Sequence, residues 1–304
     1  MTPLDTVKEN LSLLHKDMMH VSEKTLYELS ELSEILYKRM GYDLHTETAE
    51  MLLHRGSVAP FLFSTLQDEI PAAYKHILKE KETFTHAVYV CAFSLFLSEK
   101  IRKGGKNALP WKEQGRARAR IVYVPSSKAD EAYFTLAALR REASVVYAES
   151  TQDAINILLS READFAMLPY LSANGERVRG VDRLCAQNDL YLCARISFPE
   201  KEDTLVYALF STQIAPYIQT DTMALSLQIT ADSYAHLGRI LSAIPAFGYE
   251  QASLFTEAEE YGRVRACAEL FGEGDALALW LYLSLYSAGS TLLGRYPVIE
   301  TKER

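Results

Sequence analysis

Hydrophobic residues recur with helical spacing through the first third of the chain. Between residues 4 and 40 they follow one another at intervals of three, four and eight positions, which predicts one long helix with an apolar stripe. Similar spacing predicts a short helix over residues 46–54 and another over residues 71–103. We therefore expect an N-terminal helical bundle over residues 1–103.

The stretch that follows, KGGKNALPWKEQGR, breaks this periodicity. Two adjacent glycines, a proline and several basic residues leave no repeating apolar face, which is typical of a connection between domains. We therefore expect an exposed linker over residues 104–116.

Beyond the linker, short apolar runs alternate with amphipathic segments. The apolar runs lie at residues 121–124, 144–147, 165–168 and 190–196, and segments with helical spacing separate them. This alternation predicts a parallel sheet with helical crossovers. The run at 165–168 has no polar position, as expected of a strand that is covered on both faces. The pattern predicts one α/β lobe with a mostly parallel sheet over residues 117–212.

The last part of the chain, residues 213–304, has a different order of elements. A strand, a helix, two further strands, a second helix and a final strand predict a βαββαβ domain of the ferredoxin-like type. The fold class expected for the complete chain is therefore α+β, with several domains.

The second helix of this domain, residues 275–288, is apolar around almost its whole circumference. Its centre reads LALWLYLSLY, which exceeds what one face can bury against a four-stranded sheet. A second subunit or the helical bundle of the same chain is needed to cover it, and the alternative cover is the α/β lobe of the same chain. We expect a homodimer in which Trp280 and Tyr286 are interface anchors.

Composition narrows the function classes. The chain has 48% hydrophobic and 24% charged residues, as soluble globular proteins do, and its formal charge of -8 argues against a nucleic-acid partner. A small pocket can still be locally cationic, so a small anionic metabolite is the expected partner. The longest apolar run is too short to span a bilayer, and the first residues carry no export signal. We expect a cytoplasmic protein without a membrane partner.

No metal or cofactor signature is visible in the sequence. The four cysteines lie far apart without C-x-x-C spacing, which favours buried free thiols. No pair of histidines has the spacing of a zinc helix. We expect neither a metal ion nor an organic cofactor.

Polar side chains follow two of the predicted strands. Ser126, Ser127 and Lys128 come after the first strand and begin a helix, while Ser172 and Asn174 come after the third strand. Ligands of open α/β sheets bind beyond the carboxyl ends of the strands. Hydroxyls and a cation at a helix N-terminus can hold an anion, whereas an ordinary N-capping serine explains the first of these patterns equally well.

A further pattern lies in residues 150–169, where Ser150, Ala154, Leu158, Ala163-Asp164 and Leu168-Pro169 follow one another. In this order they resemble the Ser, Ala, Leu, Ala-Asp and Leu-Pro pattern of the prephenate dehydratase family. Near the end of the chain, LGRYP is similar to the Leu-Gly-x-Tyr-Pro that commonly finishes these enzymes. The three successive domains resemble the bifunctional chorismate mutase/prephenate dehydratase family, whose last domain is an ACT domain.

The resemblance implies a function in phenylalanine biosynthesis. A prephenate dehydratase protonates the ring hydroxyl of prephenate while carbon dioxide leaves, giving phenylpyruvate without a metal or organic cofactor. The helical bundle would add chorismate mutase activity. The resemblance places the catalytic threonine at Thr204, and the substrate-binding residues expected beside it are Ser126, Ser127, Lys128, Ser172 and Asn174.

The positions that carry chemistry in this family are altered here. Other residues replace the acidic-amide pair after the third strand, the two glycines after the first strand and the arginine after the catalytic threonine. The α/β region is also long enough for one lobe where the family has two. The alternative function is therefore that of a catalytically silent ACT-containing protein, which keeps the fold and acts as a small-molecule sensor or as a regulatory or structural protein.

Overall fold

The computed structural model describes residues 27, 29–34, 84–103, 119–140, 143–171, 178, 181–198, 206–213, 217–218, 220, 223–287 and 289–301. The chain divides into two compact units. Unit 1 combines Met1–Pro110 with Leu227–Leu292, and unit 2 combines Trp111–Ser226 with Leu293–Arg304.

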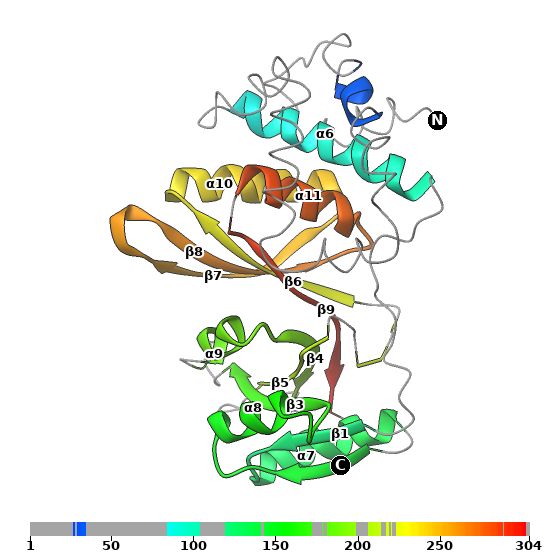
Figure 1. Ribbon diagram of the computed structural model, residues 1–304, viewed down its shortest axis with the longest axis vertical. Coiled ribbons are helices and arrows are strands. Elements are labelled where there is room, and N and C mark those ends of the chain that lie inside the picture. Colours follow the sequence, from blue (N-terminus) through cyan, green and yellow to red (C-terminus); the bar gives the residue numbers. More distant parts are fainter. Residues whose placement is uncertain are drawn as a thin grey trace. The chain divides into compact units, whose positions relative to one another are not determined.

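Unit 1 has a sheet with the strand order β9-β6-β8-β7, and helices α10 and α11 cover one of its faces (Figure 1). In chain order the elements are β6 (Met223–Ala231), α10 (Tyr234–Ala243), the 3-10 helix η1 (Ile244–Phe247), β7 (Glu250–Ala258), the 3-10 helix η2 (Glu260–Gly262), β8 (Val264–Phe271), α11 (Ala276–Tyr286) and β9 (Thr291–Glu300). The first residues of β6 and the larger part of β9 belong to unit 2. This is the βαββαβ order expected from the sequence.

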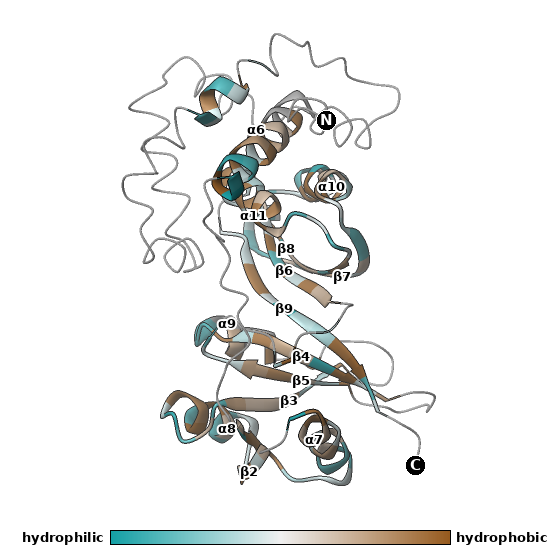
Figure 2. Ribbon diagram, turned by 90° about the vertical axis from the view of Figure 1, so that its right-hand side faces the viewer, coloured by the Kyte–Doolittle hydropathy of each residue, from teal (hydrophilic) through white to brown (hydrophobic). Residues whose placement is uncertain are grey.

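Helix α6 (Phe84–Lys103) packs against α11 and α10 on the side away from the sheet, as two perpendicular views show (Figures 1 and 2). Every residue of α11 from Leu277 to Tyr286 is buried. The N-terminal part of the same chain therefore supplies cover for a helix that is apolar on all sides. Trp280 and Tyr286, which we expect to anchor a dimer, are both buried within one chain.

Asp275, at the start of α11, forms polar contacts with α6. Its Oδ1 accepts a hydrogen bond from the backbone N–H of Ala278 at 3.0 Å, which caps the helix. Its Oδ2 accepts the hydroxyl of Ser98 at 2.7 Å and pairs with the guanidinium of Arg102 at 3.0 Å. One carboxylate thus satisfies groups on two helices.

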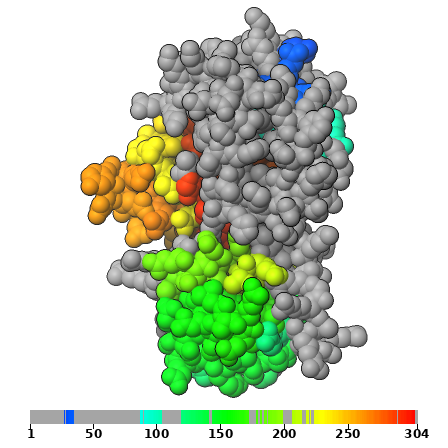
Figure 3. All heavy atoms as spheres, in the orientation of Figure 1, coloured from blue at the N-terminus to red at the C-terminus, as the bar shows by residue number. Residues whose placement is uncertain are grey.

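The neighbouring strands β8 and β7 of unit 1 differ in burial. Alternate residues of β8 are fully buried, as expected for a strand with one face under helices, and these residues are Val264, Ala266, Ala268 and Leu270. The edge strand β7 is exposed or half-buried along its whole length, and Figure 3 shows it at the surface in orange.

The predicted N-terminal bundle is described in part. Residues 29–34 and α6 are helical, in agreement with the predicted helices over residues 4–40 and 71–103. Apart from residue 27, which is also helical, the other residues of these predicted helices lie outside the described residues. So do the predicted helix over residues 46–54 and the linker over residues 104–116. Among the described helices, none is long and apolar enough to cross a membrane.

Unit 2 has a sheet with the strand order β2-β1-β3-β5-β4-β9. Its first five strands are β1 (Ala119–Tyr123), β2 (Ala143–Tyr147), β3 (Phe165–Leu171), β4 (Tyr191–Ser197) and β5 (Val206–Ser211). Strand β1 is parallel to β2 and β3, and β4 is parallel to β9. The sequence pattern does not predict β5, which runs antiparallel to both β3 and β4, because no segment with helical spacing separates it from β4.

Helices cover both faces of this sheet. Helix α7 (Ser127–Leu139) packs on one face, and α8 (Thr151–Leu159) buries its apolar side against β1 and β3 on the other (Figure 2). The short helix α9 (Val181–Gln187) also contacts β3. Cover on both faces explains the unbroken apolar run at residues 165–168, all of which are buried.

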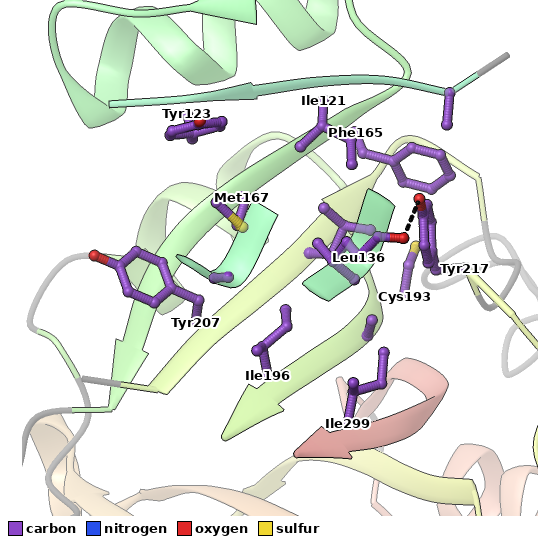
Figure 4. Packing of buried hydrophobic residues seen from close by; sticks show 14 of the residues in the cluster. Ile121, Tyr123, Leu136, Phe165, Met167, Cys193, Ile196, Tyr207, Tyr217 and Ile299 are labelled. Atoms are coloured by element: carbon purple, nitrogen blue, oxygen red, sulfur yellow. Dashed lines mark hydrogen bonds between the residues drawn. The ribbon is translucent and has the colours of Figure 1, made fainter. Parts of the chain in front are cut away.

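The core of unit 2 lies between α7 and the sheet (Figure 4). Tyr217 closes one end of this cluster, where its hydroxyl donates to the carbonyl oxygen of Leu136 at 3.2 Å and its ring lies 5.0 Å from the guanidinium carbon of Arg140. Burial raises the pKa of Tyr217 to about 12, so its hydroxyl stays protonated near neutral pH. Tyr123 and Tyr207 lie at the opposite end of the cluster (Figure 4).

Candidate functional site

The start of α7 is built as the sequence predicts. Ser126 is the N-cap, and its Oγ accepts a hydrogen bond from the backbone N–H of Ala129 at 3.1 Å. Ser126 and Ser127 are both exposed, and they follow the carboxyl end of β1. The ordinary capping role of Ser126 is therefore present, and the hydroxyl remains accessible from solvent.

Tyr207 of β5 reaches the same point from the middle of the sheet. Its backbone is paired with Pro169 of β3 on one side and with Ile196 of β4 on the other, and only 5% of the residue is exposed. Its hydroxyl lies 3.3 Å from the Oγ of Ser126. The contact joins the start of α7 to the start of β5.

Lys128 is held at the first turn of α7 by two partners. Its Nζ lies 3.3 Å from a carboxylate oxygen of Glu131 and 4.8 Å from the ring centroid of Phe198, which follows β4. The ring of Phe198 in turn packs edge-on against that of Tyr207, with 6.3 Å between centroids. The Lys128 side chain is 39% exposed, so its ammonium can still approach a ligand.

A second polar contact lies beside this turn. The hydroxyl of Tyr123, the last residue of β1, donates to Oδ1 of Asp130 at 2.8 Å. Burial, together with this carboxylate, raises the pKa of Tyr123, which keeps it neutral near neutral pH. Asp130 and Glu131 place two carboxylates in the first turns of α7, so Lys128 supplies a cation to a locally mixed, rather than purely positive, surface.

Three of the predicted site residues lie outside the described residues. Ser172 and Asn174 come after Leu171, the last residue of β3, and Thr204 comes shortly before Val206, the first residue of β5. Leu171 and Val206 are partners in the antiparallel register of β3 and β5. The described residues Leu171 and Val206 therefore lie side by side on adjacent strands.

The structure thus brings together Ser126, Ser127 and Lys128 with two residues that the sequence analysis does not single out, Phe198 and Tyr207. Phe198 directly follows a predicted strand, which was a usable signal. Tyr207 had no such signal, because β5 is not predicted.

The described residues contain no cluster of side chains suited to bind a metal ion. The four cysteines are buried free thiols, and no group of three or more His, Cys, Asp or Glu side chains that could hold a metal ion occurs within the described ranges. The chemistry available at the described part of the site is hydrogen bonding by hydroxyls and charge neutralisation by one ammonium group.

Comparisons with known proteins find likeness in solved structures. No protein-family model matches the chain, and no curated protein matches it. The prephenate dehydratase of Streptococcus mutans is similar with a TM-score of 0.49 and 19% identity, over 60% of this chain and 99% of that one. The prephenate dehydratase of Arthrobacter aurescens in complex with L-Phe has a TM-score of 0.45 and 12% identity, over 59% and 89% of the two chains.

A protein of a different description is similar to a comparable degree. GqqA, described as a novel type of quorum-quenching acylase, has a TM-score of 0.47 and 18% identity, over 59% of this chain and 94% of that one. Prephenate dehydratases are thus among the solved structures that this chain is similar to, at low identity.

Proposed function

We propose that this chain is a prephenate dehydratase-related protein of phenylalanine biosynthesis, and that unit 2 binds prephenate and converts it to phenylpyruvate. The observation that carries the proposal is the 3.3 Å approach of the Tyr207 hydroxyl to Ser126 Oγ. Tyr207 lies three positions after Thr204 in the sequence. The contact supports a site in which the segment assigned to substrate binding and the segment assigned to catalysis share one edge of the sheet.

Each residue has a role that its chemistry allows. The hydroxyls of Ser126 and Ser127 would donate hydrogen bonds to a carboxylate of prephenate, and Lys128 would balance its charge. Ser172 and Asn174, which follow β3 in the sequence, would also bind the substrate. Thr204 would donate a proton to the departing ring hydroxyl, so that water and carbon dioxide leave and the ring becomes aromatic. The roles need no metal and no organic cofactor.

Turnover of prephenate tests the proposal. We expect the purified protein to form phenylpyruvate, which ultraviolet absorbance detects, and Thr204→Ala to lose this activity. Lys128→Ala should raise the KM for prephenate about tenfold, because a charge-assisted hydrogen bond is worth about 1.5–3 kcal/mol. Lys103→Ala is the matched control, since Lys103 also pairs with a glutamate on an exposed helix surface, Glu99 at 2.8 Å.

The possible outcomes test the proposed activity and the role of Lys128 separately. If the wild-type protein leaves prephenate unchanged, the dehydratase proposal is wrong. If turnover occurs and Lys128→Ala has the KM of the wild type, Lys128 does not contact the substrate. A parallel incubation with chorismate tests the additional mutase activity, which the resemblance of the N-terminal bundle suggests.

A second candidate is a catalytically silent sensor that binds an anionic metabolite without converting it. Two features of the site support this candidate. The ammonium of Lys128 is paired with Glu131, and Leu205 follows Thr204 where the family has an arginine. Saturable binding of prephenate or phenylpyruvate in a calorimeter, without loss of prephenate over hours, would favour the sensor. In that case the βαββαβ domain would act as an ACT-type regulatory domain.

A further inference from the structure

The contact between Tyr207 and Ser126 has a directional consequence for the ligand. A serine oxygen can accept two hydrogen bonds and donate one. The Ser126 Oγ already accepts the backbone N–H of Ala129 at 3.1 Å. The hydroxyl of Tyr207 at 3.3 Å can occupy the second acceptor position or take the serine proton, since either atom can be the donor.

A carboxylate decides between these two arrangements. A carboxylate can only accept hydrogen bonds, so it requires the proton of Ser126. Ser126 can give this proton to a ligand only if it does not give it to Tyr207. The bound arrangement is therefore a chain in which the Tyr207 hydroxyl donates to Ser126 Oγ and the Ser126 hydroxyl donates to the carboxylate. Such a chain strengthens both hydrogen bonds, because each polarises the other.

Tyr207 is fixed well enough to act in this way. It is 5% exposed, its backbone is paired on both sides, and its ring packs edge-on against Phe198. The same Phe198 ring lies 4.8 Å from Lys128 Nζ. The position of the serine hydroxyl and that of the ammonium are thus set by two aromatic residues that touch each other.

We propose that Tyr207 is a positioning residue: when a carboxylate binds at the start of α7, the Tyr207 hydroxyl donates to Ser126 Oγ and leaves the serine proton for the ligand. The inference rests on the proposed function, because it assumes that a carboxylate binds there. It adds a residue, and the direction of its hydrogen bond in the bound state, that neither the sequence pattern nor the family resemblance assigns.

Four proteins test the inference: the wild type, Tyr207→Phe, Ser126→Gly and the double variant. Tyr207→Phe removes the hydroxyl and keeps the ring, and glycine at position 126 removes the side chain while remaining acceptable at an N-cap. We expect Tyr207→Phe to raise the Kd for phenylpyruvate about fivefold in calorimetry. In the Ser126→Gly background the same change should have no further effect, because Tyr207 acts through Ser126.

A matched control removes a different tyrosine hydroxyl from the same unit. Tyr133 of α7 donates to the carbonyl oxygen of Ala143 at 3.2 Å, so Tyr133→Phe also loses one hydrogen bond but none to Ser126. We expect its Kd for phenylpyruvate to equal that of the wild type. An equal loss of affinity in Tyr133→Phe and Tyr207→Phe would indicate a general structural effect and overturn the inference.

Unfolding of the same four proteins in urea, without ligand, keeps the test independent of the proposed function. Non-additive changes in the unfolding free energies of Tyr207→Phe and Ser126→Gly are expected, whereas additive changes overturn the inference whether or not a ligand binds. If neither prephenate nor phenylpyruvate binds the wild type, the proposed function and the inference that rests on it both fall. If phenylpyruvate binds wild type and Tyr207→Phe equally, only the inference falls.

Discussion

Gly274 lies at a point where two backbone segments of unit 1 touch. A Cβ atom at Gly274 would stand 2.2 Å from the carbonyl oxygen of Phe247, and one at Gly272 would stand 2.5 Å from the carbonyl oxygen of Gly248. Gly248 itself has a φ of 82°, which residues that carry a Cβ atom rarely adopt. Because the opposing atoms belong to the backbone, they cannot rotate aside as a side chain would. The connection from β8 to α11 therefore depends on glycine.

Substitution at this point should be costly. We expect Gly274→Ala to lower the free energy of unfolding by about 1–3 kcal/mol, as overpacking does in other cores. Gly238→Ala in α10 is the control, because nothing lies within 4 Å of the added Cβ. Alanine inside a helix is favoured over glycine by about 0.5–1 kcal/mol, so Gly238→Ala should be more stable than the wild type. Urea denaturation measures both, and equal midpoints for the two variants would contradict this account.

At the scale of elements, Asp275 couples the start of α11 to α6. Removing its carboxylate loses an N-cap worth about 1 kcal/mol and charge-assisted hydrogen bonds to α6 worth about 1.5–3 kcal/mol. We expect Asp275→Ala to lower the free energy of unfolding by about 2–4 kcal/mol. Asp275→Ser keeps a capping hydroxyl and loses the contacts to Ser98 and Arg102, so it should lie between Asp275→Ala and the wild type.

The serine variant is the informative one. If Asp275→Ser unfolds at the same urea concentration as the wild type, the contacts to Ser98 and Arg102 contribute nothing measurable. The docking of α6 would then depend on its packing against α11 and α10. Ser98→Ala, which removes only one of the two partners of Oδ2, provides a smaller change in the same direction.

The helices α7, α8 and α11 and the strand β3 could be predicted because local signals mark them. Ser126, Ser150 and Asp275 each accept a backbone N–H at the start of a helix, and each is a residue type that favours this role. Strand β3 is apolar throughout its buried part because helices lie on both faces of the sheet. Such patterns depend on neighbours in the sequence, so the sequence alone reveals them.

The missed parts depend on contacts between residues that are distant in the sequence. Strand β5 is antiparallel between β3 and β4, an insertion that no alternation of strands and helices indicates. Tyr207 is a site candidate only because β5 brings its hydroxyl to Ser126, 81 positions away. The predicted position of Ser126 and Lys128 at a strand end could be read from the sequence, but the aromatic pair that holds them could not.

At the scale of the whole molecule, the burial of α11 and the formation of a homodimer are two different questions. The sequence suggested a second subunit because this helix is apolar on all sides. Within one chain, Trp280 is only 4% exposed, and α6 packs against the same helix. Trp280 therefore belongs to the interior of unit 1, and we expect a homodimer to use a surface other than the one that α6 covers.

Substitution of Trp280 distinguishes these roles. We expect the wild type to sediment at micromolar concentration as a species of twice 34.3 kDa, and Trp280→Ala to keep this mass while the protein is folded. The same substitution should lower the free energy of unfolding by about 3–5 kcal/mol, because it empties a large volume in a packed core. Tyr234→Ala is a suitable control, since Tyr234 is 60% exposed on α10 of the same unit and this variant should unfold like the wild type.

A wild-type species of 34.3 kDa would exclude a stable dimer. A Trp280→Ala variant that halves in mass without losing stability would instead identify α11 as the contact between subunits.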